Sequence, residues 1–242
     1  ITGIQGVDTR ALTKILRSQG SMNGMLTCAE RFNIAEVLEQ LKAYQVKNTV
    51  ALVTRGEPEV FPAYGEERFH VAMMDYGVKQ HMIECLCKRG CRVTALPAST
   101  PAEAVLAGGY DGVMLSNGPG DPAENTAIIE ELKKLYASDI PLFGVCLGHQ
   151  LLALATGART GRLAYGHRGG NHPVRDMEKG RVFITSQNHG YMVLPGSVDP
   201  TVAEVSHVNV NDGTCEGLIY KRPNCFTTQF HPEANAGPKD TE

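Results

Sequence analysis

The 242-residue sequence contains no tryptophan, no long hydrophobic run and no large excess of charge of either sign. Its longest apolar stretches, such as residues 140–147, are far too short to cross a bilayer, so we expect no membrane association. The 23 basic and 26 acidic residues form no basic stripe, which gives nucleic-acid binding no electrostatic support. Since 42% of the residues are hydrophobic, the composition is that of a globular chain.

The seven cysteines lack any C-x-x-C pair, and their odd number argues against a disulfide scaffold. Cys85, Cys87 and Cys91 lie close together, but no histidine stands beside them at the spacing of a zinc site. We therefore expect small buried thiols, no bound metal, and a reducing compartment such as the cytoplasm.

The chain begins with Ile1 rather than methionine, and we interpret it as a piece of a longer polypeptide. Residues 1–58 show helical patterns at 10–17 and 34–44 and are interpreted as part of a smaller N-terminal domain. Residues 59–68 have the composition of a linker. Residues 69–242 then form the main domain.

In the main domain, apolar strand patterns alternate with amphipathic helix patterns. The predicted strands are 69–77, 91–98, 111–115 and 140–148, and the predicted helices are 78–89, 102–107, 125–137 and 149–158. This alternation predicts an α/β fold with a mostly parallel central sheet flanked by helices. Residues 160–232 are richer in strands. Sheets of this kind carry their sites at the carboxyl ends of the strands.

The sharpest motif is the G-x-C-x-G sequence around Cys146, between a predicted strand and a predicted helix. The same spacing with serine forms the nucleophile elbow of hydrolases, in which a strained turn lifts the nucleophile above the sheet. The N-terminus of the following helix favours a thiolate, and the N–H of Leu147 is placed to stabilise an oxyanion. A cysteine that is simply buried is the alternative for this motif taken alone.

A second motif is the sequence S-N-G-P-G-D-P at residues 116–122, which follows a strand. Its glycines and prolines predict a rigid loop whose amides can face a ligand. The N–H of Gly118 or Gly120 is a candidate second oxyanion donor, although the loop alone is also compatible with a plain tight turn. It matches neither of the common phosphate-binding glycine patterns.

A catalytic cysteine needs a base, and the base needs a group that orients it. The sequence F-H-P-E supplies His231 and Glu233, and Pro232 between them is expected to hold the segment extended, so that both side chains face one side. His189 is the main rival for the base, whereas His149 is expected to pack or cap. The pair His167 and His172 lacks a carboxylate at a metal-binding spacing, and ordinary loop histidines are favoured there.

The motifs G-V-C-L-G-H-Q, S-N-G-P-G-D-P and F-H-P-E, in this order, resemble those of the class I (triad-type) glutamine amidotransferases. The resemblance covers about residues 69–242 and implies the flavodoxin-like fold of that family. It implies hydrolysis of L-glutamine to glutamate and ammonia through a thioester on Cys146, with His231 as the base and Glu233 as its orienting group. It further implies oxyanion and glutamine contacts at Gly118, Gly120, Leu147, Gln150, Asn188, Gly190 and Tyr191.

Three further segments, at 165–174, 185–193 and 231–242, together with the N-terminal GVDTRALTKILRSQGSMNGML, are similar to the small subunits of carbamoyl phosphate synthetases. This implies ammonia delivery to a large synthetase subunit, or to fused synthetase domains, that makes carbamoyl phosphate from bicarbonate. No cofactor is expected in this chain, and ATP and magnesium are expected on that partner. The resemblance also implies a preceding segment that contributes one more contact to glutamine.

Three alternatives stay open at this point. One is the glutaminase of another amidotransferase, of the GMP or anthranilate type, or a γ-glutamyl hydrolase. Another is a non-catalytic regulatory subunit with the same fold, against which the complete set of cysteine, histidine and glutamate argues. The third is a free-standing cysteine peptidase.

Overall fold

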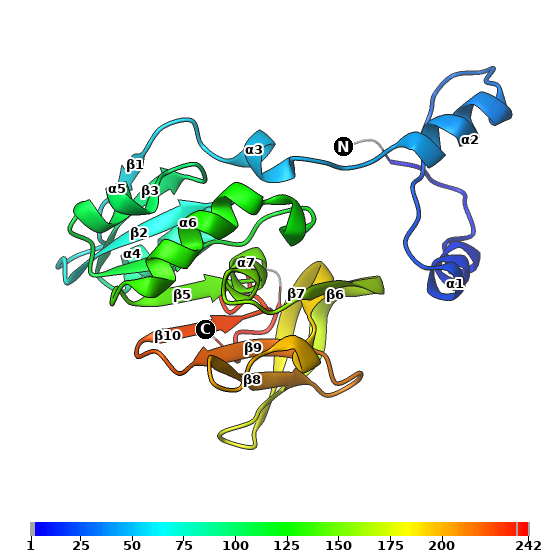
Figure 1. Cartoon of the computed structure of the whole chain (residues 1–242). Helices are drawn as coiled ribbons and strands as arrows, with labels where there is room; N and C mark the ends of the chain where they lie inside the picture. The colour runs from blue at the N-terminus through cyan, green and yellow to red at the C-terminus, as the bar shows by residue number, and fades with distance from the viewer. Residues whose placement is uncertain (1–2, 236, 242) are drawn as a thin grey trace.

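A computed structural model describes residues 3–235 and 237–241. The outer ends of the predicted domains, at residues 1 and 242, and position 236 of the 231–242 motif lie outside the described residues. Ten strands form one sheet in the order β1-β3-β2-β4-β5-β10-β9-β8-β6-β7 (Figure 1). The strands are β1 (Glu59–Phe61), β2 (Phe69–Asp75), β3 (Cys91–Pro97), β4 (Gly112–Leu115), β5 (Leu142–Val145), β6 (Thr160–Asp176), β7 (Val182–Val193), β8 (Ala203–Asn209), β9 (Cys215–Tyr220) and β10 (Cys225–Thr228).

Five strands, β3, β2, β4, β5 and β10, pair in parallel. The first four were predicted from the alternating pattern, whereas β10 comes from the strand-rich part at 160–232. Their order along the sheet, 2-1-3-4-5 in chain order, is that of flavodoxin-like folds. Most of their side chains are apolar and buried because helices cover both faces, although Phe69 and Phe226 are about half exposed. The predicted α/β class is confirmed.

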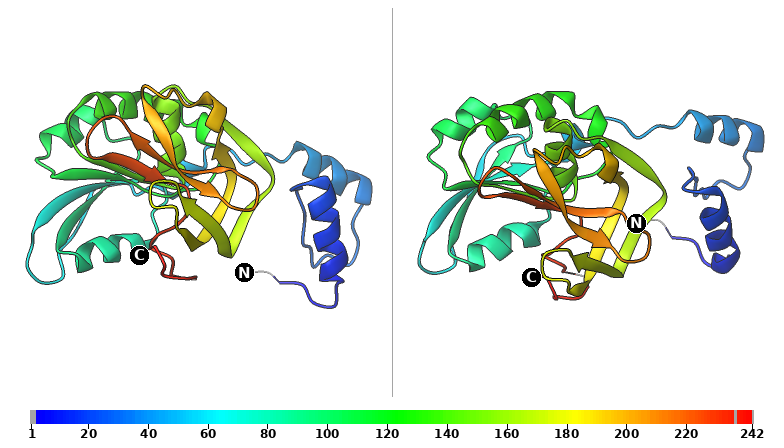
Figure 2. Two further views of the ribbon diagram at one scale, coloured as in Figure 1. Left: turned by 90° about the horizontal axis from the view of Figure 1, so that it is seen from below. Right: turned by 60° about the horizontal axis from the view of Figure 1, so that its bottom comes forward.

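The rest of the sheet is antiparallel, so the sheet as a whole is mixed rather than mostly parallel. β6 and β7 form a long hairpin, and β8, β9 and β10 continue the antiparallel pairing. The connections there are short, and a short connection can join only antiparallel neighbours. The hairpin twists out of the plane of the parallel strands (Figure 2).

Helices divide between the two faces of the sheet. The helices α5 (Ala102–Ala107), α6 (Thr126–Ala137) and α7 (Leu147–Ala155) pack into one core cluster, and α4 (Gln80–Lys88) packs into the other. The two views of Figure 2 show α4 on the side of the sheet opposite to α6 and α7. Short 3₁₀ turns follow at Pro122–Glu124 and Pro195–Ser197. No helix in the described part of the chain has the length and apolarity to cross a membrane.

The N-terminal residues form an arm beside this body (Figure 1). Its helices α1 (Thr9–Gln19) and α2 (Ile34–Ala43) agree with the two predicted ones, and neither has a buried residue. The third helix, α3 (Thr49–Val53), was not predicted and buries Val50 in the main core. The domain boundaries themselves stay a prediction.

Within the predicted linker, residues 59–61 are strand β1, which pairs antiparallel with β3. A three-residue edge strand followed by Pro62 has too short a pattern to be recognised from the sequence. The ordered connection to the body therefore starts earlier than residue 69.

Candidate active site

Three turns meet at the carboxyl edge of the parallel strands, as the sequence predicts. Residues 76–79 follow β2, residues 116–120 follow β4, and Cys146 follows β5. Each turn is fixed by hydrogen bonds of its own, such as those from the Gly77 and Val78 amides to Asp75 Oδ1 at 2.9 and 2.8 Å. Because neighbouring parallel strands end on the same edge, residues that are far apart in the sequence are brought together here.

Cys146 sits in a strained backbone conformation with φ 54° and ψ −102°, immediately before α7. The glycines two residues before and after Cys146 are required because there is no room for a side chain at either position. A Cβ at Gly148 would lie 2.3 Å from the carbonyl oxygen of Leu115, and one at Gly144 would lie 2.9 Å from the backbone of Gly148. The predicted nucleophile elbow is therefore present, with the thiol 4% exposed at the start of a helix.

The two predicted oxyanion amides lie in neighbouring segments. Leu147 is the first residue of α7, so its N–H has no acceptor within the helix. Gly118 packs directly against it, since a Cβ at Gly118 would lie 2.6 Å from Leu147 Cδ2 and 2.2 Å from Tyr76 O. Only glycine fits at position 118, and the loop backbone there lies against the elbow.

His231 and Glu233 form a buried hydrogen-bonded pair. Glu233 Oε1 lies 2.7 Å from His231 Nδ1, and both side chains are 3% exposed. Although burial disfavours the charged ring, the charge of the Cys146 thiolate, a hydrogen bond with Cys146 and the pairing with Glu233 raise the pKa of His231 to about 9. The sequence-predicted sulfur, imidazole and carboxylate thus form one chain of contacts.

The geometry of the His231 segment differs from the prediction. Residues 231–234 form a tight turn in which the Ala234 amide donates to His231 O at 3.1 Å, and Ala234 has φ 52°. Glu233 reaches the ring because the chain folds back, whereas the extended segment predicted from Pro232 does not exist. The His231 amide donates to Ser186 O at 2.9 Å, which ties this turn to β7.

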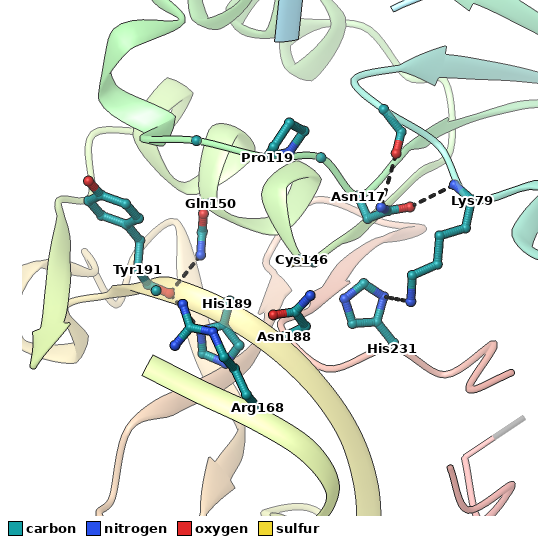
Figure 3. A pocket seen from close by; sticks show the side chains of 14 residues that line it. Lys79, Asn117, Pro119, Cys146, Gln150, Arg168, Asn188, His189, Tyr191 and His231 are labelled. Atoms are coloured by element: carbon teal, nitrogen blue, oxygen red, sulfur yellow. Dashed lines mark hydrogen bonds between the residues drawn. The ribbon is translucent and has the colours of Figure 1, made fainter. Parts of the chain in front are cut away.

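Lys79 is a charged contact of this pair that the sequence analysis missed. Its Nζ lies 3.2 Å from Glu233 Oε1 and 3.3 Å from His231 Nδ1. Figure 3 shows the contact with His231. Despite burial, His231 and Lys79 hold the pKa of Glu233 below its usual value, so this carboxylate stays ionised. The only signal was the position of Lys79 just after a predicted strand.

A pocket of about 390 Å³ opens in front of Cys146 (Figure 3). The predicted contacts Gly118, Gly120, Gln150, Asn188, Gly190 and Tyr191 all line it, as do Cys146 and His231. Leu147 and Glu233 lie behind its wall. Lys79, Asn117, Arg168 and His189 also line it, and Lys79 and Arg168 bring two cationic side chains to its rim.

The side chain of Gln150 fastens one wall of the pocket to another. Its amide nitrogen donates to Tyr191 O and to Gln229 Oε1, both at 2.8 Å. This places the strand residues 188–191 opposite the elbow. Gln150 was predicted as a glutamine contact, and in the structure its side chain holds the backbone of Tyr191, another of the predicted contacts.

His149 and His189 are held by partners other than Cys146. Burial lowers the pKa of His149 to about 3, and this ring lies at hydrogen-bonding distance from Thr227, which agrees with the packing role expected for it. His189 lines the pocket, but its Nδ1 lies 2.7 Å from Tyr191 O, and burial lowers its pKa to about 4. His189 thus supports the wall, whereas His231 contacts the thiol.

Comparison with known proteins identifies the family of this chain. The family described as class-I glutamine amidotransferase matches residues 72–242, and the chain belongs to that family. The solved glutamine amidotransferases of Thermotoga maritima (TM-score 0.55, 19% identity, 69% of this chain and 77% of that one) and Methylobacillus flagellatus (TM-score 0.55, 16% identity, 70% and 71%) share the fold.

Individual relatives are much closer in sequence. The chain is 46% identical over 242 residues to the carbamoyl phosphate synthase small chain of Clostridium perfringens and 47% identical over 240 residues to that of a Bacillus cereus strain. The alignments cover 100% and 99% of this chain. They cover 67% and 64% of the two relatives, so the chain spans about two thirds of their length.

Proposed function

We propose that this chain is the glutaminase part of a glutamine-hydrolysing carbamoyl phosphate synthase. The observation that carries the proposal is the contact chain from Cys146 through His231 to Glu233 at the wall of a small pocket. A binding subunit without catalysis would not need a strained, buried thiol paired with an imidazole. The similarity to carbamoyl phosphate synthase small chains supports the choice of synthase.

In the proposed reaction, the Cys146 thiolate attacks the side-chain amide carbon of glutamine. The new C–S bond gives a tetrahedral oxyanion, which the amides of Leu147 and Gly118 stabilise by about 3 kcal/mol each. His231 then gives its proton to the amide nitrogen, the C–N bond breaks and ammonia leaves. Finally His231 takes a proton from water, whose hydroxide attacks the thioester, and the C–S bond breaks to release glutamate and the thiolate.

Ammonia released into water at neutral pH would be protonated and lose its nucleophilicity, so we propose that it passes directly to a large synthetase subunit or fused domain. ATP and magnesium would bind to that partner. We place this chain in the cytoplasm, which the free, buried thiols of Cys215 and Cys225 support.

The test is a pair of assays on the chain assembled with its synthetase partner. Cys146→Ala should abolish glutamine-dependent carbamoyl phosphate formation and the thioester adduct on residue 146 seen by mass spectrometry, while formation from added ammonia continues. Cys28→Ala, which removes an exposed thiol of the arm, is the matched control and should change neither activity. Glutamine turnover by Cys146→Ala would overturn the mechanism, and ammonia transfer to another acceptor would favour a different amidotransferase.

A further inference from the structure

A second cluster of chemically active side chains lies next to the pocket, inside the antiparallel half of the sheet. His167 of β6 is the register partner of His189 of β7, and Glu216 comes from β9, which β8 separates from β6 in the sheet. Their potential ligand atoms all lie within 4.8 Å of one another. His167 and His189 are 6% exposed, Gln187 is 2% exposed, and Glu216 is completely buried.

Four donor atoms converge in this cluster. Gln187 Oε1 lies 2.9 Å from His167 Nδ1 and 2.9 Å from His189 Nε2, and Glu216 Oε1 lies 3.3 Å from His167 Nδ1. In a tetrahedral zinc site with bonds of about 2.0–2.1 Å, neighbouring ligand atoms are separated by about 3.3 Å. These three separations, of 2.9–3.3 Å, are close to the distance between two corners of such a site.

Hydrogen bonds on the outer side of each ring fix which nitrogen faces the cluster. His189 Nδ1 lies 2.7 Å from the carbonyl oxygen of Tyr191, and His167 Nε2 lies 2.8 Å from Asp212 Oδ2. Both partners are acceptors, so these two nitrogens carry the hydrogens. Gln187 Oε1 is an acceptor for the inward nitrogens, so without a metal at least one hydrogen lies between them, and a bound cation would displace it as a proton. The outer partners orient the two rings as such partners orient metal-bound histidines.

The two oxygen donors are oriented in the same way. Gln187 Nε2 donates to Thr185 Oγ1 at 3.1 Å, which turns its Oε1 toward the two rings. Asn209 Nδ2 donates to Glu216 Oε1 at 3.1 Å, whereas Glu216 Oε2 is buried and makes no hydrogen bond within the described residues. A completely buried carboxylate oxygen without a partner is costly unless a cation binds it.

We propose that His167, His189 and Glu216, with Gln187 as a fourth ligand, bind one divalent cation of the zinc class. Two imidazoles and a carboxylate are a common zinc-binding set, and the cation would neutralise the buried carboxylate. It would cross-link β6, β7 and β9 directly behind residues 188–191 of the pocket wall. The proposal does not rest on glutamine hydrolysis and is tested by metal binding alone.

The test titrates the purified, untagged chain with Co²⁺ and follows visible absorption, with Zn²⁺ competition and elemental analysis after dialysis. We expect one Co²⁺ per chain with d–d bands of nitrogen and oxygen ligation, displaced by Zn²⁺, and no thiolate-to-metal charge-transfer band. The absence of this charge-transfer band distinguishes binding at the proposed site from binding to cysteine thiolates. No binding by the wild-type chain, or a spectrum of thiolate ligation only, would overturn the proposal.

Two variants locate the site. Glu216→Gln keeps the side-chain shape and should weaken Co²⁺ binding by more than about 100-fold, and Asp212→Asn, at the rim, should weaken it by about 10-fold because it releases His167. His81→Asn, a histidine of α4 far along the chain, is the control and should bind as the wild type does. Full-strength binding by both Asp212→Asn and Glu216→Gln would place the metal elsewhere and contradict the assignment.

Discussion

Helices α7 and α1 both carry apolar side chains, six in α7 and four in α1, yet the two helices lie in opposite environments. Seven residues of α7 are buried, whereas α1 has none, and Leu12 and Ile15 of α1 are 49% and 48% exposed. Most stability of a short helix comes from packing, so α7 is held by the core and α1 by its local caps. An apolar stripe therefore indicates that a helix has a face to bury, but not that the same chain supplies the partner surface.

The body also differs from the arm in what its glycines do. Gly144, Gly148 and Gly118 have no room for a Cβ, while Gly24 of the arm has no atom within 4 Å of that position. Backbone approaches of this kind hold the elbow and the loop at 116–120 together. Substitutions that are matched between the two regions test whether the body and the arm differ in this way.

The largest effect is expected for Gly148→Ala. The new methyl group would meet the Leu115 carbonyl at 2.3 Å, so the elbow must move away from β4. We expect a loss of about 3–5 kcal/mol in the free energy of unfolding, measured by urea denaturation, together with loss of glutamine hydrolysis. Gly24→Ala is the matched control and should change the unfolding free energy by less than about 0.5 kcal/mol. Equal effects at the two positions would contradict the packing argument.

The next largest effect is expected for truncation of a core leucine. Leu151 of α7 is completely buried, and Leu151→Ala should lower the free energy of unfolding by about 3 kcal/mol through lost burial and a cavity. Leu12→Ala removes the same atoms from the half-exposed face of α1 and should cost less than about 0.5 kcal/mol. A large cost for Leu12→Ala in thermal unfolding would mean that the arm packs more tightly than the structure shows.

The sequence allowed prediction of the parts of the site that local rules determine. The turns around Gly118 and Cys146 were visible because glycine and proline stand directly after apolar strand patterns. The contacts of Lys79 and the turn at His231 were missed, since both depend on where β10 ends relative to β2 and β7. Glu216 joins His167 only through strand register, which no local spacing reveals.

A smaller effect, with a pH signature, is expected for Glu233→Gln. In the wild type His231 has a pKa of about 9 against 6.5 for an unperturbed ring, so its charged form stabilises the folded state fully below about pH 6.5, and this stabilisation is lost as the pH rises through about 9. Removing the carboxylate charge should lower the pKa of His231 and reduce glutamine hydrolysis about 10- to 100-fold.

NMR titration of the His231 ring provides the measurement. The midpoint of the chemical-shift change should move downward in Glu233→Gln, while Glu39→Gln, a carboxylate of α2 in the arm, should leave it in place. An unchanged midpoint in Glu233→Gln would mean that Glu233 does not tune the ring, even if the hydrogen bond at 2.7 Å persists.

The smallest effect is expected in the arm itself. The side chain of Asp8 accepts a hydrogen bond from the Ala11 amide at 2.9 Å and caps α1. Asp8→Ala should cost about 1 kcal/mol of local helix stability and so speed amide hydrogen exchange in the first turns of α1 about 5-fold. Because α1 buries nothing, the midpoint of global unfolding should stay where it is, as it should for the control Glu30→Ala. A lower midpoint in Asp8→Ala would show that the arm and the body unfold as one cooperative unit, and the distinction between a packed body and a locally capped arm would then fail.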